Sequence, residues 1–177
     1  MISVQGPEAA APAPPAALRL RLELELPSDV RYIEPIVGLV QHECRLFAFP
    51  ASHCTLNVPV ALSEAISNAI LRGNEADPSR TVRVRVHASQ AEMVLEVEDE
   101  GEGFDLEALT HDPADPANIE REDGRGLFLM HALMDRVERF DRPASEEDGR
   151  GGRRHNVVRL TLRRRATRPG MMAGARG

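Results

Sequence analysis

Apolar and polar residues alternate in three stretches of the chain, and this pattern predicts three strands. From Leu18 to Leu26 every even position is leucine and every odd position is arginine or glutamate, and Pro27 ends the run. The stretches Thr81–Ala88 and Met93–Asp99 alternate in a similar way. A period of two places the apolar side chains of each strand on one face of a sheet.

The second and third of these strands are predicted to form a hairpin around a loop at Ser89–Glu92. Aligning them across this loop brings apolar residues together on one face and opposite charges together on the other. The predicted pairs are Val84 with Val97, Val86 with Leu95, Arg83 with Glu98 and Arg85 with Glu96. A last pair of strands is predicted at about Val137–Phe140 and Asn156–Leu162, joined by a loop rich in glycine and arginine.

Two segments show the period of an amphipathic helix. The first begins after an N-cap hydroxyl at Ser28 and runs through Phe49, with Pro35 marking a helix start or a kink. Its apolar positions are Val30, Ile33, Val37, Val40, Cys44 and Phe47. The second is Val58–Gly73, whose apolar stripe consists of Val58, Leu62, Ala65, Ile66 and Ala69. Strands with one apolar face and amphipathic helices together predict an α/β (α+β) two-layer sandwich, with helices on one face of a mixed sheet.

The ends of the chain differ in composition from the part between them. Residues 7–17 are proline and alanine almost throughout, and the residues from Arg163 onward are rich in arginine and glycine without periodicity. We therefore expect a flexible tail at 1–17, one domain at 18–165 and a second flexible tail at 166–177.

Charge and composition exclude several classes of function. The net charge of −6 disfavours general nucleic-acid binding, which needs excess positive charge. All 22 basic residues are arginines, so a mechanism that uses a lysine amine is excluded. The sequence shows no signal peptide and no run of 18 apolar residues, and it has only two cysteines. These features favour a cytoplasmic protein that does not enter a membrane.

Polar residues stand opposite the apolar stripe of the second predicted helix. Glu64 and Asn68 are one turn apart there, and Arg72 extends the same line by another turn. A solvated polar face is the simpler interpretation, because charged residues opposite an apolar stripe are common. An asparagine in mid-helix fits that interpretation poorly, since asparagine is a weak helix former.

Two glycine motifs follow. Asp99, Gly101 and Gly103 form a DxGxG motif at the end of a strand, where glycines allow close approach of a ligand, although a turn or a calcium loop would show similar residues. Gly124 and Gly126 precede an apolar helix that is predicted to begin near Leu127. Free amides at such a helix start bind phosphates, and the alternative is the first turn of a buried helix.

The order of the three motifs resembles the N, G1 and G2 boxes of the GHKL ATP-binding fold. Within that superfamily, ALSEAISNAI and GRGLFLMHALMD are most similar to the stand-alone serine/threonine kinase anti-sigma factors of bacteria. The resemblance covers about residues 18–165. It implies a Bergerat-type fold with a mostly antiparallel mixed sheet, and use of ATP and Mg²⁺.

The resemblance also implies a role for each matching residue. Glu64 would be the catalytic base and Asn68 the Mg²⁺ ligand, and Asp99 would accept a hydrogen bond from the adenine amino group. The other residues that would contact the nucleotide are Arg72, Gly101, Gly103, Phe104, Gly124, Arg125, Gly126 and Leu127. The acidic stretch 105–123 would be a mobile lid.

One position departs from the family pattern. The last strand often opens with a phosphate-binding threonine, and here Val157 stands at that place, with Asn156 as a possible substitute. We therefore keep two hypotheses. The first is a kinase that phosphorylates an anti-anti-sigma antagonist and sequesters a sigma factor, as a homodimer; the second is an ATP-binding partner-switching module without kinase activity. A histidine kinase fragment is disfavoured, since the proline- and alanine-rich tail leaves no room for a phosphoacceptor helix.

A zinc site is the remaining metal hypothesis. His42, Cys44, His53 and Cys54 are the available ligands, but residues two apart on a helix point about 200° away from each other. Buried thiols and ordinary polar histidines are the better interpretation.

Overall fold

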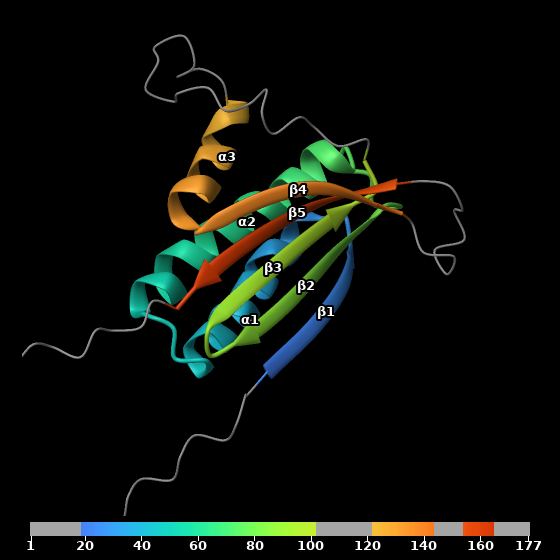
Figure 1. Ribbon diagram of the computed structural model, residues 1–177. Helices are drawn as coiled ribbons and strands as arrows, with labels where there is room; N and C mark the ends of the chain where they lie inside the picture. The colour runs from blue at the N-terminus through green and yellow to red at the C-terminus, as the bar shows by residue number, and fades with distance from the viewer. Residues whose placement is uncertain (1–18, 102–121, 144–153, 165–177) are drawn as a thin grey trace, which may run out of the picture.

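The computed structural model describes residues 19–101, 122–143 and 154–164, with residues 122–124 described by their backbone alone (Figure 1). The strands are β1 (Arg19–Pro27), β2 (Thr81–Ser89), β3 (Glu92–Asp99), β4 (Arg136–Pro143) and β5 (Arg154–Arg163). The helices are α1 (Ile33–Leu46), α2 (Val58–Asn68) and α3 (Glu122–Leu133). A 3₁₀ turn (Val30–Tyr32) precedes α1, and π-helical turns at His53–Asn57 and Ala69–Gly73 extend α2 at both ends.

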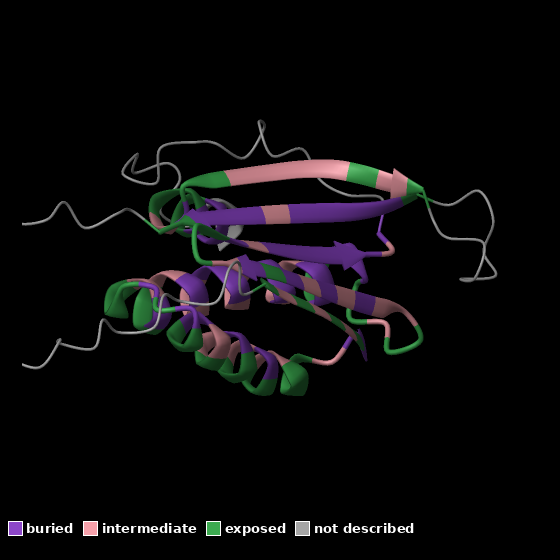
Figure 2. Ribbon diagram, turned by 60° about the horizontal axis from the view of Figure 1, so that its bottom comes forward, coloured by how far each residue is buried: buried purple, intermediate pink, exposed green. Residues whose placement is uncertain are grey.

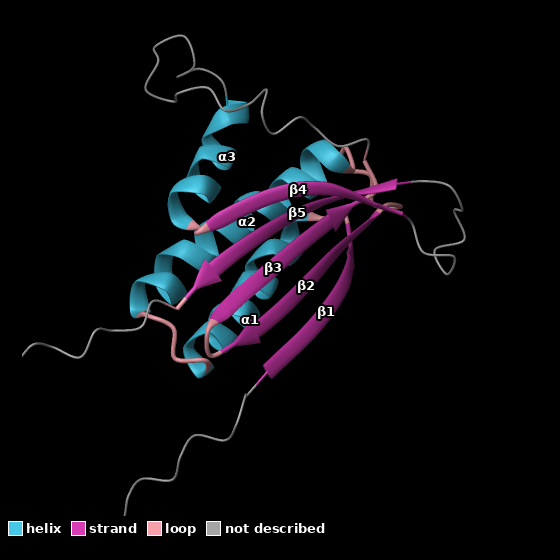
Figure 3. Cartoon of the chain, viewed as in Figure 1, coloured by secondary structure: helices cyan, strands magenta, loops and turns pink. Residues whose placement is uncertain are grey.

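The five strands form one sheet in the order β1-β2-β3-β5-β4, and the helices cover one of its faces. Figure 2 shows the two layers, with buried residues where the helices meet the sheet. The predicted two-layer α+β architecture is therefore confirmed (Figure 3). Every pairing among the described strands is antiparallel, so the parallel pair that a mixed sheet would contain does not occur in this part of the chain.

The hairpin of β2 and β3 has the predicted register. Arg83 faces Glu98, Val84 faces Val97, Arg85 faces Glu96 and Val86 faces Leu95. The loop is shorter than predicted, because Ser89 and Glu92 belong to the strands and two residues remain between them. The Ser89 hydroxyl accepts hydrogen bonds from the amides of Ala91 and Glu92, which stabilises the tight turn.

The start of the first helix differs from its prediction. Asp29, not Ser28, caps the 3₁₀ turn, and its carboxylate accepts from the amide of Arg31 at 2.9 Å. The Ser28 hydroxyl instead donates to the carbonyl of Arg80 and accepts from Asn74. The prediction of Ser28 as N-cap was therefore wrong, because a long-range partner outcompetes the local one. Pro35 lies in the first turn of α1, as expected for a proline at a helix start.

The segment from His53 to Gly73 is one continuous helical element in the middle of the fold. It is long and apolar enough to cross a membrane, with a mean hydropathy of 1.2 over its most apolar window, but its buried stripe packs in the core of the molecule. The five residues predicted for this stripe are all buried: Val58, Leu62, Ala65, Ile66 and Ala69. Glu64 and Asn68 lie on the less buried side, as predicted.

Helix α3 begins earlier than predicted, at Glu122 and not near Leu127. Gly124 and Gly126 therefore lie inside the first turns of the helix and do not precede it. Glycine normally disfavours a helix interior, and the packing of α3 against α2 overrides that preference here. Leu127 and Met130 are buried in this contact region of the core.

The outer face of the sheet carries ion pairs in place of a second helical layer. Glu96 and Glu98 are buried there among arginines from neighbouring strands. Arg85 lies 2.5 Å from Glu98, and Arg159 lies 2.6 Å from Glu96. Further ion pairs join Arg83 to Glu98 and Arg142 to both glutamates. The charged pairs predicted on this face of the hairpin are thus part of a larger network.

Asn74 joins the edge of the sheet to the end of the central helix. Its side-chain amide donates to the Ser28 hydroxyl at 2.7 Å and to the carbonyl of Thr81 at 3.0 Å. Its side-chain oxygen accepts from the amide of Glu100 at 2.8 Å. This buried residue therefore links the residues that follow β1 and β3 to the start of β2.

Candidate functional site

The candidate site follows the central helix, from the contact between α2 and α3 to the contact between Gly73 and the end of β3. Glu64 and Asn68 project from the less buried side of α2, and Gly126 of α3 lies directly against them. A Cβ atom on Gly126 would be 2.4 Å from Glu64 Oε2 and 3.7 Å from Asn68 Nδ2. A larger side chain at this position would displace the Glu64 carboxylate, so glycine leaves room for that carboxylate beside α3.

A hollow of about 380 Å³ opens beside this contact. Five of the residues that the sequence assigns to one site line this hollow: Glu64, Asn68, Arg72, Arg125 and Gly126. Ser67, Leu71 and Leu129 complete the lining. The two arginines bring positive charge to a hollow that also holds a carboxylate, which suits a ligand with several negative charges.

Asp99 lies at the end of β3 and is 2% exposed. One carboxylate oxygen accepts from the amide of Gly101 at 2.9 Å, and the other accepts from the side-chain amide of Asn156 at 2.8 Å. Burial raises the pKa of Asp99, and these hydrogen bonds offset the rise only in part. A buried carboxylate of this kind is an acceptor that can select a ligand with an amino group.

Two glycines shape the surroundings of Asp99. A Cβ on Gly73, the last residue of the central helix, would lie 2.4 Å from the Asp99 carboxylate. A Cβ on Gly101 would lie 2.1 Å from the carbonyl oxygen of Gly73. The end of the helix and the end of β3 are therefore closely packed, and a side chain at either glycine would push them apart. Sequence analysis assigned Gly101 but missed Gly73, whose only signal was its place after the last apolar position of the helix.

The last strand places Asn156, not Val157, on the side of the site. Asn156 faces Asp99 in the register of β3 and β5 and lies on the helix-covered face of the sheet. Val157 faces Glu98 and Phe140 on the outer face and is fully buried. The Asn156 side-chain oxygen accepts from Nε of Arg139, which fixes the amide with its nitrogen toward Asp99.

Glu64 and Asp99 mark the two ends of the candidate site. Gly73, the neighbour of Asp99, follows Glu64 by nine positions along the same helical element, which is roughly two turns. Asn68 lies between them. An elongated ligand with an amino group at one end and negative charge at the other matches this arrangement.

The donor set near Glu64 fits a magnesium ion. Asn68 offers an amide oxygen, and Mg²⁺ prefers oxygen ligands with few protein contacts and shared phosphates. The hollow that both residues line leaves room beside them, since Gly126 contributes no side chain.

Comparison with known proteins decides the family. Residues 26–162 match the histidine kinase-like ATPase domain. The chain belongs to this family. The match includes α2, β3, α3 and all of β5 but its last residue, so every described residue of the candidate site of this histidine kinase-like ATPase domain lies within it.

Individual relatives are similar over a shorter stretch. The serine-protein kinase RsbW of Oceanobacillus iheyensis is 35% identical over 86 residues, which are 46% of this chain and 54% of the relative. The anti-sigma F factor of Clostridium perfringens is 32% identical over 93 residues, 52% of this chain and 64% of the relative. RsbW of Bacillus subtilis is 31% identical over 86 residues, 46% of this chain and 54% of the relative. The matched stretch thus spans less than two thirds of each relative's length.

Several predicted features lie outside the described residues. Gly103, Phe104 and nearly all of the predicted lid at 105–123 are among them, and Gly124 is described by its backbone alone. The described residues contain no cluster of histidine, cysteine and acidic side chains that could hold a metal. Cys44 and Cys54 are buried free thiols, as the sequence predicts.

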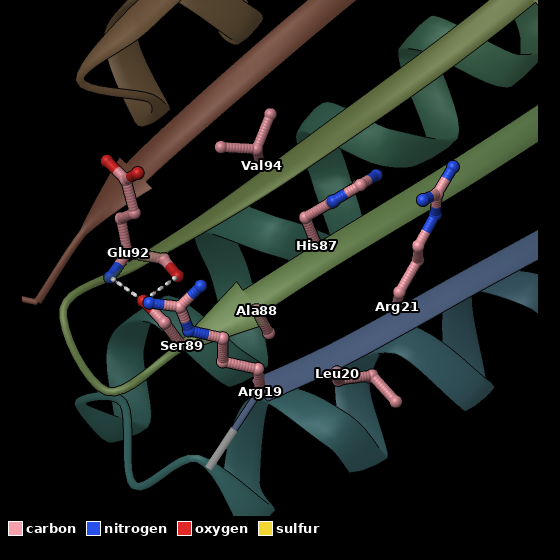
Figure 4. Close-up of a pocket in the computed structure, with 8 residues that line it drawn as sticks. All are labelled: Arg19, Leu20, Arg21, His87, Ala88, Ser89, Glu92 and Val94. Atoms are coloured by element: carbon pink, nitrogen blue, oxygen red, sulfur yellow. Dashed lines mark hydrogen bonds between the residues drawn. The ribbon is translucent and has the colours of Figure 1, made fainter. Parts of the chain in front are cut away.

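A second hollow, of about 480 Å³, lies on the outer face of the sheet and is larger than the first. Figure 4 shows its lining at the turn between β2 and β3, with Arg19, Arg21 and His87 projecting from β1 and β2. It contains none of the residues assigned to the nucleotide. The smaller hollow is the candidate site, because the predicted residues converge there.

Proposed function

We propose that the protein is an ATP- and Mg²⁺-dependent serine/threonine protein kinase that phosphorylates an anti-anti-sigma antagonist and sequesters a sigma factor. The proposal includes a cytoplasmic location, a homodimer, and a role in transcription regulation during a stress response. The names of the relatives, a serine-protein kinase and an anti-sigma factor, support it. The observation that carries it is the contact of Gly126 with Glu64 and Asn68, which joins the proposed base, metal ligand and phosphate-binding helix.

The nucleotide would lie along the central helix. Asp99 would accept a hydrogen bond from the amino group of adenine, and Arg72 and Arg125 would contact the phosphates. Asn68 would hold the magnesium ion through its side-chain oxygen. When bound, Mg²⁺ supplies charge neutralisation on the transferred phosphate, the main requirement of phosphoryl transfer.

Glu64 would act on the hydroxyl of the antagonist. As that hydroxyl oxygen attacks the γ-phosphorus, the bond from phosphorus to the β,γ-bridging oxygen breaks and ADP leaves. The hydroxyl proton passes to the Glu64 carboxylate. Partial exposure of Glu64 at the hollow leaves it accessible to a partner's side chain.

The test separates the base from the metal ligand. We expect Glu64→Gln to retain binding of ATP and of the sigma factor while phosphoryl transfer to the antagonist falls by about 10²-fold or more, the contribution of a positioned base. Asn68→Ala should instead lose Mg²⁺-dependent ATP binding in calorimetry. Equal transfer rates in Glu64→Gln and wild type would contradict the proposed base.

A binding module without kinase activity is the second candidate. Val157 stands at the place of the family's threonine, with Asn156 beside it, and the missing threonine supports a changed use of the nucleotide. A folded wild type that binds Mg·ATP and a sigma factor but transfers no phosphate to any antagonist, as measured by mass spectrometry, would establish this alternative.

A further inference from the structure

The outer hollow, beside the turn between β2 and β3, has no part in the proposed function. Its volume of about 480 Å³ is within the range that is typical of small-molecule sites. The side chains that line it come from the start of β1, the end of β2 and the start of β3. They lie apart from the candidate nucleotide site, which is lined from α2, α3 and the turn that extends α2.

The arginines in the middle of the outer face are neutralised within the chain. Arg83 and Arg85 lie 3.0 Å and 2.5 Å from Glu98. Arg159 lies 2.6 Å from Glu96. These guanidinium groups have carboxylate partners inside the sheet, so their charge is not available to a ligand.

The arginines at the hollow differ from those in the middle of the face. Arg19 and Arg21 are exposed, and among the residues that the structure describes neither forms an ion pair. The carboxylate of Glu92 also lines the hollow, but Figure 4 shows it turned toward β5, where Arg163 faces it in the strand register. The hollow therefore carries uncompensated positive charge on a chain whose net charge is −6.

The strand register gathers three donor side chains on one side of the hollow. Arg21 faces His87 across β1 and β2, and side chains directly opposite each other are about 5 Å apart at Cβ. Arg19 lies two positions before Arg21 on the same face, about 6.6 Å away along the strand. Arginine side chains are long enough to span these separations. Figure 4 shows Arg21 and His87 projecting to the same side of the sheet.

A phosphate monoester matches these donors better than a carboxylate does. At neutral pH it carries nearly two negative charges and has three acceptor oxygens, one for each donor side chain. Guanidinium groups bind such oxygens through paired, charge-assisted hydrogen bonds. A carboxylate has one charge and two oxygens, which would leave part of the donor set unused. Val94 faces His87 from β3 and adds apolar surface to the lining, beside the place of the phosphate.

We propose that the outer hollow binds a small molecule that carries a phosphate monoester. Arg19, Arg21 and His87 hold the phosphate, and an apolar part of the ligand lies against Val94. The limited volume of the hollow favours a small molecule over an acidic segment of a protein. This inference goes beyond the proposed function and does not rest on it, because these residues lie outside the candidate nucleotide site.

The test uses the full chain and phenyl phosphate, a probe that joins a phosphate monoester to an apolar ring. Titration followed through the amide chemical shifts should show saturable shifts at residues 19–21 and 87–94. Inorganic phosphate, which lacks the ring, should bind there more weakly. We expect the double variant Arg19→Gln, Arg21→Gln to bind phenyl phosphate at least about tenfold more weakly, since charge-assisted hydrogen bonds are lost.

A matched control removes the same charge elsewhere. Arg45→Gln together with Arg154→Gln changes α1 and the start of β5 and should leave the affinity for phenyl phosphate unchanged. Circular dichroism melts establish that each variant is folded. His87→Gln, which keeps both arginines, is a second variant of the site and should also weaken binding.

Three outcomes would overturn the proposed site. One is the absence of saturable shifts around the hollow, including the case in which only Arg125 and Gly126 shift. Another is an unchanged affinity in both the arginine variant and His87→Gln. The third is a hexaglutamate peptide that binds residues 19–21 and 87–94 more tightly than phenyl phosphate, which would assign the hollow to an acidic protein segment. Loss of ATP binding or phosphoryl transfer, measured separately, would contradict the proposed function alone.

Discussion

The side-chain amide of Asn156 donates a 2.8 Å hydrogen bond to the carboxylate of Asp99. The amide cannot turn freely, because Arg139 donates to its oxygen from β4. A donor is therefore held beside a buried acceptor at the end of the site proposed for the base. Adenine presents an amino donor next to a ring-nitrogen acceptor, so this pair of side chains matches its edge.

We expect Asn156→Leu to weaken ATP binding by about tenfold, since the loss of one hydrogen bond to a buried charge costs roughly 1–3 kcal/mol. Isothermal titration with Mg·ATP measures the effect. Val157→Thr is the matched control, because its side chain faces the outer side of the sheet. It should lower the melting temperature without changing affinity. An affinity gain in Val157→Thr would mean that the site extends to the outer face.

Asp99→Ala should weaken ATP binding more severely than any other single change at this end of the site, because no other carboxylate is proposed to receive the adenine amino group. The raised pKa of Asp99 adds a pH dependence. As pH falls through this raised pKa, the carboxylate gains a proton and loses an acceptor, so the affinity of the wild type should decrease on acidification. Asp99→Asn should remove that dependence, and an unchanged pH profile in it would assign the titration to another group.

Gly126→Ala should reduce phosphoryl transfer, because the new methyl group would lie 2.4 Å from Glu64 Oε2 and force that side chain to move. We expect the rate of phosphoryl transfer to fall by about tenfold or more, because Glu64 would no longer be held in the position of the base. Gly38→Ala is the control. A Cβ at Gly38 has nothing within 4 Å, so this change in the middle of α1 should stabilise the fold by about 0.5–1 kcal/mol and leave transfer unchanged. Full activity in Gly126→Ala would show that transfer does not depend on this placement of the Glu64 carboxylate.

The lowered pKa of Glu98 leads to a prediction about the stability of the fold. Burial alone would raise its pKa, but hydrogen bonds from Arg85 and His155 outweigh burial and lower it to about 2. A lowered pKa stabilises the fold above the ordinary value of 4.5, and this contribution is lost as pH falls from 4.5 toward 2. The shift corresponds to about 3 kcal/mol.

Urea unfolding measures this contribution. At pH 7, Glu98→Gln should lower the free energy of unfolding by about 3 kcal/mol, and the difference from wild type should shrink below pH 4.5. Glu34→Gln, at an exposed position of α1, should change stability by less than about 0.5 kcal/mol. A difference that stays constant down to pH 3 would show that the loss comes from packing and not from charge.

The hairpin and the helix stripe could be predicted because their signals are local and periodic. The register of Val84 with Val97 follows from alternation on both faces at once. The predicted meeting of Glu64, Asn68 and Gly126 came from the order of motifs.

Other features depend on partners that are distant in sequence. Ser28 has the residue type of a helix cap, yet its hydroxyl binds Arg80 and Asn74, 52 and 46 residues away. The start of α3 was misplaced because a glycine that permits close helix packing has the same sequence signal as a glycine that ends a loop. The side of the sheet that Asn156 faces follows from the pairing of β5 with β3, which no local pattern fixes.

The side chain of Asn74 holds two segments that are far apart in the sequence. Through Ser28 its hydrogen bonds hold the residue after β1, and through the amide of Glu100 they hold the residue after Asp99. The end of β1 and the segment that follows Asp99 are thus anchored to one amide group. Loss of this single side chain would therefore release both segments together.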